Sequence, residues 1–141
     1  MARYHEFSHT VRDEDIDPQN HANNVAYLEW MQSAAIDHSA TQGWSTQRYR
    51  ENGWAWVVRS HFIEYRRPAL LGDELTIHTW VADMKKFSSL RKYEIVFSES
   101  GKLVARAETN WAFVTTEAGR LIAIPDDVAQ SFEVSPDRPP A

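Results

Sequence analysis

Four carboxylates, one histidine and several side-chain amides lie close together between residues 13 and 24, directly before a predicted helix. The run reads Asp13-Glu14-Asp15-Ile16-Asp17-Pro18-Gln19-Asn20-His21-Ala22-Asn23-Asn24. Side chains of this kind contribute little to a hydrophobic core, and the start of a helix presents unpaired backbone N–H groups. A carboxylate that faces a helix start across a cleft can attack a carbonyl carbon or activate water, while the helix dipole stabilises the oxyanion. The segment therefore predicts a hydrolytic site.

Each polar residue of this segment also has a structural interpretation. Asp17 precedes Pro18, a pair typical of turns, and the residues alone support the turn and the catalytic role equally. His21 could act in catalysis or simply hydrogen-bond within the loop. Asn23 and Asn24 are expected first as helix caps and second as substrate contacts.

Two metal-binding patterns in the sequence do not complete a site. His5-Glu6-Phe7-Ser8-His9 has the H-E-x-x-H spacing of zinc proteases, but its alternation predicts a strand. Residues four apart on a strand are roughly 13 Å apart, too far to share one ion. The run from Asp13 begins like a calcium loop, yet Pro18 and Asn24 replace the required glycine and glutamate. No metal and no cofactor is predicted, and Asp13 and Asp15 are expected as solvated strand ends, with Asp15 also able to hold the loop.

Hydrophobic periodicity predicts one long helix and a series of strands. The helix begins at Asn23 or Asn24 and ends at Gly43, about 19 residues or roughly 28 Å. Strands are predicted at residues 4–12, 54–67, 75–82, 87–99 and 103–116, with short helical segments at 46–52 and after Pro125. This order indicates an α+β fold in which one antiparallel sheet packs around one helix. We expect a single domain over residues 1–134 and a flexible tail over residues 135–141.

Composition narrows the functional classes. The 141 residues are 43% hydrophobic and carry a formal net charge of -5, which disfavours a surface that binds nucleic acid or anionic membrane. The absence of cysteine removes disulfides, thiolate catalysis and zinc-thiolate sites. No signal peptide and no membrane-spanning stretch is recognisable, so a cytoplasmic protein is expected.

Three segments resemble the hotdog-fold thioesterases, both the 4-hydroxybenzoyl-CoA thioesterase type and the plant acyl-carrier-protein thioesterases. They are residues 15–30 (DIDPQNHANNVAYLEW), 63–75 (IEYRRPALLGDEL) and 102–109 (KLVARAET). The resemblance covers roughly residues 4–131. It implies a sheet wrapped around a long helix, and a homodimer or dimer of dimers that joins two sheets and binds the thioester between subunits.

The resemblance also implies roles for individual residues. Asp17 matches the acidic nucleophile or general base, and the backbone N–H around Asn24 matches the donor that polarises the thioester oxygen. His21 and Asn23 match positions near the reacting carbonyl, where Gln19 replaces a usual asparagine. Further candidate substrate contacts are Tyr27 on the helix and, at the position of CoA phosphate contacts, Lys85, Lys86, Ser88 and Ser89.

We therefore expect an enzyme that hydrolyses an acyl-CoA, and less strongly an acyl-carrier-protein thioester. A non-catalytic acyl-CoA binder or sensor is the alternative, because fold alone does not determine function. The six tryptophans are expected in the core or a subunit interface, and Trp54, Trp56 and Trp80 could also line an acyl pocket.

Overall fold

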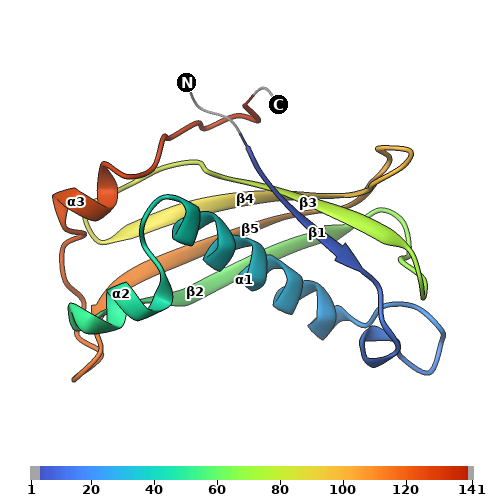
Figure 1. The fold of residues 1–141 in the computed structure, drawn as a ribbon, viewed down its shortest axis with the longest axis horizontal. Helices are drawn as coiled ribbons and strands as arrows, with labels where there is room; N and C mark the ends of the chain where they lie inside the picture. Colours follow the sequence, from blue (N-terminus) through green and yellow to red (C-terminus); the bar gives the residue numbers. More distant parts are fainter. Residues whose placement is uncertain (1–3, 140–141) are drawn as a thin grey trace.

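Five antiparallel strands form one sheet, and a long helix lies across one face of it (Figure 1). The computed structural model describes residues 4–139. The strand order across the sheet is β1-β3-β4-β5-β2, so that β1 and β2 are its two edges. Along the chain, the elements are β1 (His5–Thr10), a 3-10 helix η1 (Asp13–Asp15), α1 (Asn24–Thr41), α2 (Thr46–Glu51), β2 (Trp54–Tyr65), β3 (Glu74–Val81), β4 (Ser88–Phe97), β5 (Leu103–Thr115) and α3 (Asp126–Ala129). The predicted α+β arrangement is confirmed.

Local sequence signals set the ends of α1. The Asn23 side chain accepts a hydrogen bond from the Ala26 N–H (2.9 Å), so Asn23 is the cap and Asn24 is the first helical residue. The helix ends before Gly43, whose φ of 95° suits a residue without a side chain.

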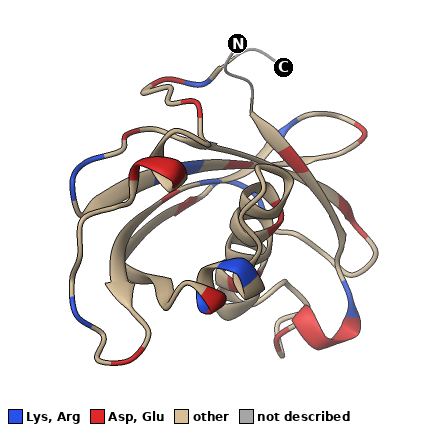
Figure 2. Ribbon diagram, turned by 60° about the vertical axis from the view of Figure 1, so that its left-hand side comes forward, with Lys and Arg blue, Asp and Glu red and all other residues tan. Residues whose placement is uncertain are grey.

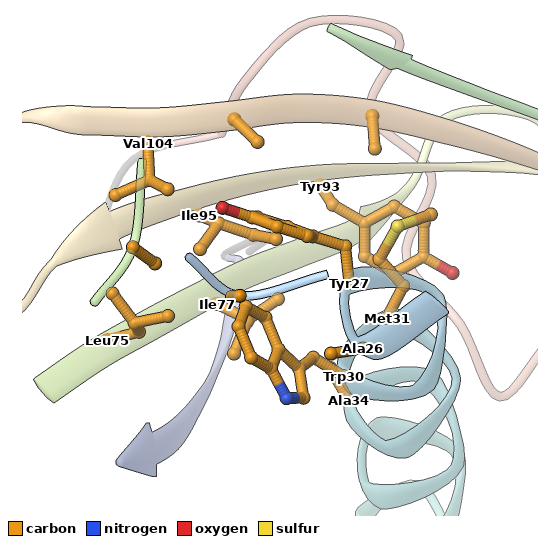
Figure 3. Close-up of a cluster of buried hydrophobic side chains, with 14 of the residues drawn as sticks. Ala26, Tyr27, Trp30, Met31, Ala34, Leu75, Ile77, Tyr93, Ile95 and Val104 are labelled. Atoms are coloured by element: carbon orange, nitrogen blue, oxygen red, sulfur yellow. The ribbon is translucent and has the colours of Figure 1, made fainter. Parts of the chain in front are cut away.

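The first core cluster lies between α1 and the sheet. Ala26 and Ala34 are small enough to let the sheet approach the helix, and Met31 is fully buried between them and the strands. Leu75 and Ile77 of β3 lie on the opposite side of this cluster (Figure 3). The sheet curves around α1 (Figure 2), so one helix covers a large part of its concave face.

A row of polar side chains lies on the concave face of the sheet beneath α1. This buried polar row consists of His38, Thr79 and Arg91, with the half-buried His5 at its end. Arg91 of β4 donates hydrogen bonds from Nη1 to His38 Nδ1 (2.9 Å) and to Thr79 Oγ1 (3.1 Å). His38, near the end of α1, stacks on His5 with ring centroids 4.9 Å apart, and His5 in turn pairs with Asp37 (2.6 Å). Burial, then the charges of Arg91 and His5, lower the pKa of His38 to about 3, so His38 is neutral at physiological pH.

One sequence expectation differs from the structure near the first strand. Asp15 is not a solvated strand end, because it lies in η1 and is only 7% exposed. Burial is the largest single influence on the pKa of Asp15 and raises it. The hydrogen bond from the Arg12 N–H (2.9 Å) and the pairing with His9 (2.9 Å) together outweigh burial, so the pKa is lowered overall. The loop-holding role that was the second possibility for Asp15 is the one observed.

The C-terminal segment crosses the convex face of the sheet. The Ser135 N–H donates to the Val81 carbonyl (2.9 Å), and Arg138 pairs with Glu94 (2.9 Å). The flexibility expected for residues 135–141 stays a prediction, and Pro140 and Ala141 lie outside the described residues. Within residues 4–139, no helix is long and apolar enough to cross a bilayer.

Replacing Asn23 by Ala should lower the free energy of unfolding by about 1 kcal/mol, because the helix loses its side-chain cap. Asn24→Ala is the matched control, since the exposed Asn24 side chain does not cap the helix, and it should change stability by less than about 0.5 kcal/mol. Urea unfolding measures both. Equal losses in the two variants would contradict the assignment of the cap.

The lowered pKa of His38 predicts a loss of stability in acid. Between the ordinary value of 6.5 and about 3, the unfolded chain binds a proton that folded His38 does not. As the pH decreases across this range, the free energy of unfolding should therefore decrease, by up to about 1.4 kcal/mol per pH unit from this group. His38→Asn keeps an acceptor near the Nδ1 position but cannot titrate.

Urea titrations at several pH values between 6.5 and 4 should show a shallower dependence for His38→Asn than for the wild type. Burial also lowers the pKa values of His61 and His78, so a residual slope is expected in both proteins. Identical slopes would show that His38 is not the group that titrates.

Candidate active site

The loop between η1 and α1 is a tight turn held by its own backbone. The Asp17 N–H donates to the His21 carbonyl (2.8 Å) and the Asn20 N–H donates to the Asp17 carbonyl (3.0 Å). Asn20 takes a φ of 67°, a left-handed conformation that asparagine tolerates better than most residues. The Ala22 N–H, bonded to the Ala69 carbonyl (2.8 Å), fastens the end of this turn to the segment before β3.

Asp17 is half-buried in this turn. Its Oδ1 accepts hydrogen bonds from the backbone N–H groups of Gln19 (2.9 Å) and His21 (3.2 Å). The turn-forming role is therefore present in the structure. These bonds engage only one carboxylate oxygen, and no described residue donates to Oδ2.

The first turn of α1 begins at Asn24, seven residues after Asp17. Its cap satisfies the Ala26 N–H, but no described residue accepts from the N–H groups of Asn24 and Val25. Both residues are exposed, Val25 by 62%. The helix start can thus donate two hydrogen bonds to an incoming oxyanion.

The other predicted site residues fall into three environments. Gln19 and His21 are exposed on the turn around Asp17. Tyr27 is 2% exposed in the core, where it packs on Trp30 with ring centroids 4.8 Å apart, and burial raises its pKa to about 12. The remaining candidates lie at the opposite end of the sheet: Lys85 and Lys86 in the β3–β4 connection, and Ser88 and Ser89 at the beginning of β4.

That connection borders a cavity of about 470 Å³ between the second half of α1, α2 and the sheet. Its size is that of a typical small-molecule pocket. Trp54 and Trp56 line it as expected, but Trp80 does not, because Trp80 alternates with Thr79 and Val81 and points to the convex face. Further lining residues are Ile36, Trp44, Tyr49, Met84, Ser89 and Trp111.

Arg91 also lines this cavity and was not among the predicted site residues. It is 6% exposed and, with Tyr93 and Ile95, shares the concave face of β4. The signal was present in the sequence, since strand alternation places this arginine on the same face as Tyr93 and Ile95. A charged residue at a core-facing position often marks a function.

Within one chain, the Asp17 loop and the cavity lie at opposite ends of α1. At the helix start, Tyr27 contacts Tyr65 at the end of β2, with ring centroids 5.0 Å apart. Beyond the helix end, Trp44 contacts Trp54 at the beginning of β2, with centroids 5.8 Å apart. Helix α1 and strand β2 therefore run in opposite directions, and the two candidate parts of the site are separated by most of the helix.

The two histidines of the H-E-x-x-H pattern have separate partners. They lie on strand β1, where His5 pairs with Asp37 and His9 pairs with Asp15. In the part of the chain that the structure describes, no three His, Cys, Asp or Glu side chains are grouped so that they could hold a metal ion.

Several known proteins with similar sequences are thioester hydrolases. The long-chain acyl-CoA thioesterase FadM of Escherichia coli is 28% identical over 126 residues, which cover 87% of this chain and 92% of that protein. The chloroplastic acyl-[acyl-carrier-protein] hydrolase FATB2 of Cuphea viscosissima is 25% identical over 130 residues. That match covers 88% of this chain but only 32% of the plant protein.

Solved structures give the same fold. A 1,4-dihydroxy-2-naphthoyl-CoA thioesterase from Synechocystis superposes with a TM-score of 0.83 at 20% identity, over 91% of this chain and 94% of that one. The model of the thioesterase-like superfamily matches residues 11–132, which is most of the chain. The hotdog arrangement predicted from the sequence is thus confirmed, and the protein belongs to the thioesterase-like superfamily.

Proposed function

We propose that this protein hydrolyses an acyl-CoA to the free acid and CoA, with Asp17 as nucleophile or general base. The observation that carries this proposal is the start of α1, where the N–H groups of Asn24 and Val25 are unpaired next to the Asp17 turn. Membership of the thioesterase-like superfamily and the likeness to FadM support the same reaction.

The geometry of the turn suits a carboxylate that reacts through one oxygen. The two backbone N–H groups on Oδ1 fix the Asp17 side chain and leave Oδ2 to act. As a base, Oδ2 takes a proton from water, the water oxygen bonds to the thioester carbon, and the C–S bond breaks. As a nucleophile, Oδ2 bonds to that carbon itself and water later cleaves the anhydride. In both routes the Asn24 N–H donates to the oxyanion and the thiolate leaves without needing a strong acid.

A second copy of the chain would complete this site. A well-placed oxyanion donor is worth about 2.7–4 kcal/mol in a site that excludes water, whereas an exposed helix dipole contributes only about 0.3–1 kcal/mol. The helix start is exposed in the single chain, so the larger value requires a cover. Strand β2 is an edge of the sheet, and its unpaired side offers backbone groups for an antiparallel partner.

Such pairing would bring together the parts that one chain separates. A two-fold axis beside β2 sets the Tyr65 end of one strand against the Trp54 end of the other. Because α1 runs opposite to β2, the Asp17 turn of one subunit then approaches the cavity and the Lys85-Lys86 turn of its partner. The acyl group would occupy the cavity, while the lysines, with Ser88 and Ser89 close by, bind the CoA phosphates.

Two other functions are the alternatives to acyl-CoA hydrolysis. A non-catalytic acyl-CoA binder would have the same cavity and would bind acyl-CoA without turnover. Hydrolysis of acyl-carrier-protein thioesters is supported only by the plant relatives. This chain matches about a third of the length of those proteins. The cytoplasmic location and the choice between dimer and dimer of dimers stay predictions.

Replacing Asp17 by Asn should reduce kcat on acyl-CoA substrates by on the order of 10³-fold, because the shape is retained and the charge is lost. Asp13→Asn is the matched control, since Asp13 is an exposed acid of the same segment, and its rate should stay near that of the wild type. Steady-state release of free CoA thiol measures both. A near-normal rate for Asp17→Asn would exclude the proposed mechanism.

A site shared between subunits predicts complementation between two inactive variants. Asp17→Asn removes the carboxylate, and Ile36→Trp should fill the cavity from an exposed position on α1. A heterodimer with one change in each subunit keeps one site in which Asp17 and the open cavity come from different chains, so it should show about half of the wild-type activity. Co-expression with two affinity tags isolates this heterodimer, and the two homodimers serve as controls. An inactive heterodimer would place the whole site in one chain.

A further inference from the structure

A buried guanidinium at the wall of the cavity lacks a carboxylate partner. Arg91 is only 6% exposed, and among residues 4–139 no Asp or Glu forms an ion pair with it. Its Nη1 donates to two neutral acceptors, His38 and Thr79. A guanidinium has five N–H donors, so Nε and Nη2 keep donors without a described acceptor.

Two more buried donors lie beside Arg91 on the concave face. The indole Nε1–H of Trp111, a residue that also lines the cavity, has no hydrogen-bond partner among the described residues. The Tyr93 hydroxyl, two residues from Arg91 on β4, also has no hydrogen-bond partner among the described residues. Burial raises the pKa of Tyr93, while the charge of Arg91 and the nearby Thr109 and Trp111 lower it in part, but no hydrogen bond of good geometry forms.

The strand register makes these groups neighbours. Arg91 of β4 lies opposite Thr109 of β5, and Ser89 lies opposite Trp111, so Trp111 is diagonal to Arg91 on the same face. Two unsatisfied buried donors, on Tyr93 and Trp111, therefore lie beside the guanidinium of Arg91, which keeps further donors of its own. A buried charge without a counter-charge and a buried donor without an acceptor both cost free energy. A ligand group that accepts hydrogen bonds from these donors would therefore bind favourably.

We propose that the cavity binds an acyl group whose far end carries a carboxylate, and that Arg91 determines this specificity. The inference rests on the proposed function, since it assigns the cavity to the acyl part of the substrate. The aromatic wall formed by Trp54, Trp56 and Tyr49 would enclose the methylene chain, while Arg91 and the Trp111 Nε1–H bind the terminal carboxylate. A chain that ends in a methyl group would leave all of these donors unpaired.

Matched substrates test this assignment. Octanoyl-CoA and suberyl-CoA have the same chain length and differ only in the terminal carboxylate, and 8-hydroxyoctanoyl-CoA adds an uncharged acceptor. For the wild type, kcat/KM should be on the order of 10- to 100-fold higher for suberyl-CoA than for octanoyl-CoA, the range expected for a charge-assisted hydrogen bond. Arg91→Met should abolish or reverse this preference while octanoyl-CoA hydrolysis continues. Arg91→Lys keeps the charge but not the fork and should give an intermediate ratio.

The stability of the variant separates a specificity role from a structural one. If Arg91 serves only the ligand, Arg91→Met should melt at or above the wild-type temperature, because an unpaired buried charge has been replaced by an apolar side chain of similar length. Free suberate should raise the melting temperature of the wild type, and 1-octanol, which has no carboxylate, should not. This binding measurement needs no turnover, so it remains informative even if no CoA ester is hydrolysed.

Several outcomes would overturn the inference. Equal kcat/KM for octanoyl-CoA and suberyl-CoA in the wild type, or a preference that survives in Arg91→Met, would exclude Arg91 as the determinant. An equal preference for the hydroxyl and the carboxylate would exclude recognition of charge. Absence of hydrolysis of every CoA ester, together with suberate binding that depends on Arg91, would instead contradict the proposed enzyme and leave the binding specificity in place.

Discussion

The close packing of α1 on one part of the sheet is the constraint on which the rest of the structure depends. Alanines at positions 26 and 34 let the helix approach β1 and β3, and Met31 fills the space between them. Because one helix cannot cover five strands, the β5–β2 part of the same face is left to aromatic side chains near Trp54. The cavity forms there, while the capped start of the helix stays open at the other end. Both candidate parts of the site follow from where a single helix lies on a wide, curved sheet.

The buried polar row has a cost that packing alone does not explain. Arg91 and His38 occupy positions where apolar side chains would fill the core without desolvating a charge. His38 compensates in part by staying neutral and accepting from Arg91, since burial and the adjacent guanidinium both oppose its protonation. Beside Arg91, the buried donors of Trp111 and Tyr93 remain without partners. Such a deficit is understandable where a ligand supplies the missing acceptors, and under the proposal it links the stability of the empty protein to the chemistry of the acyl group.

Water exclusion connects the fold to assembly. The helix start and the Asp17 turn have the donors and the carboxylate that the proposed mechanism needs, but both are open to solvent in one chain. Low dielectric, which makes an oxyanion donor effective, has to come from another surface. The unpaired edge of β2 offers a way to bring that surface, and the opposite directions of α1 and β2 determine which part of a second copy would arrive. The lysine turn and the cavity are on that part.

Local patterns in the sequence were sufficient for the long helix, its asparagine cap, the strand alternation and the turn at Asp17, because each depends on residues within a few positions of one another. Asp15 was expected first as a solvated strand end and second as a residue that holds the loop. It is buried in the second role, because its partner His9 reaches it only once the chain folds back after β1. Trp80 was grouped with the pocket tryptophans and faces the other way, because the register of β3 against β4 decides its side. Arg91 acquired its neighbours in the same manner, from pairing between strands distant in sequence. Composition and spacing thus determined which elements form and where a carboxylate meets a helix start, whereas strand register and the path of α1 decided which side chains share a cavity, since those contacts join residues that no local pattern connects.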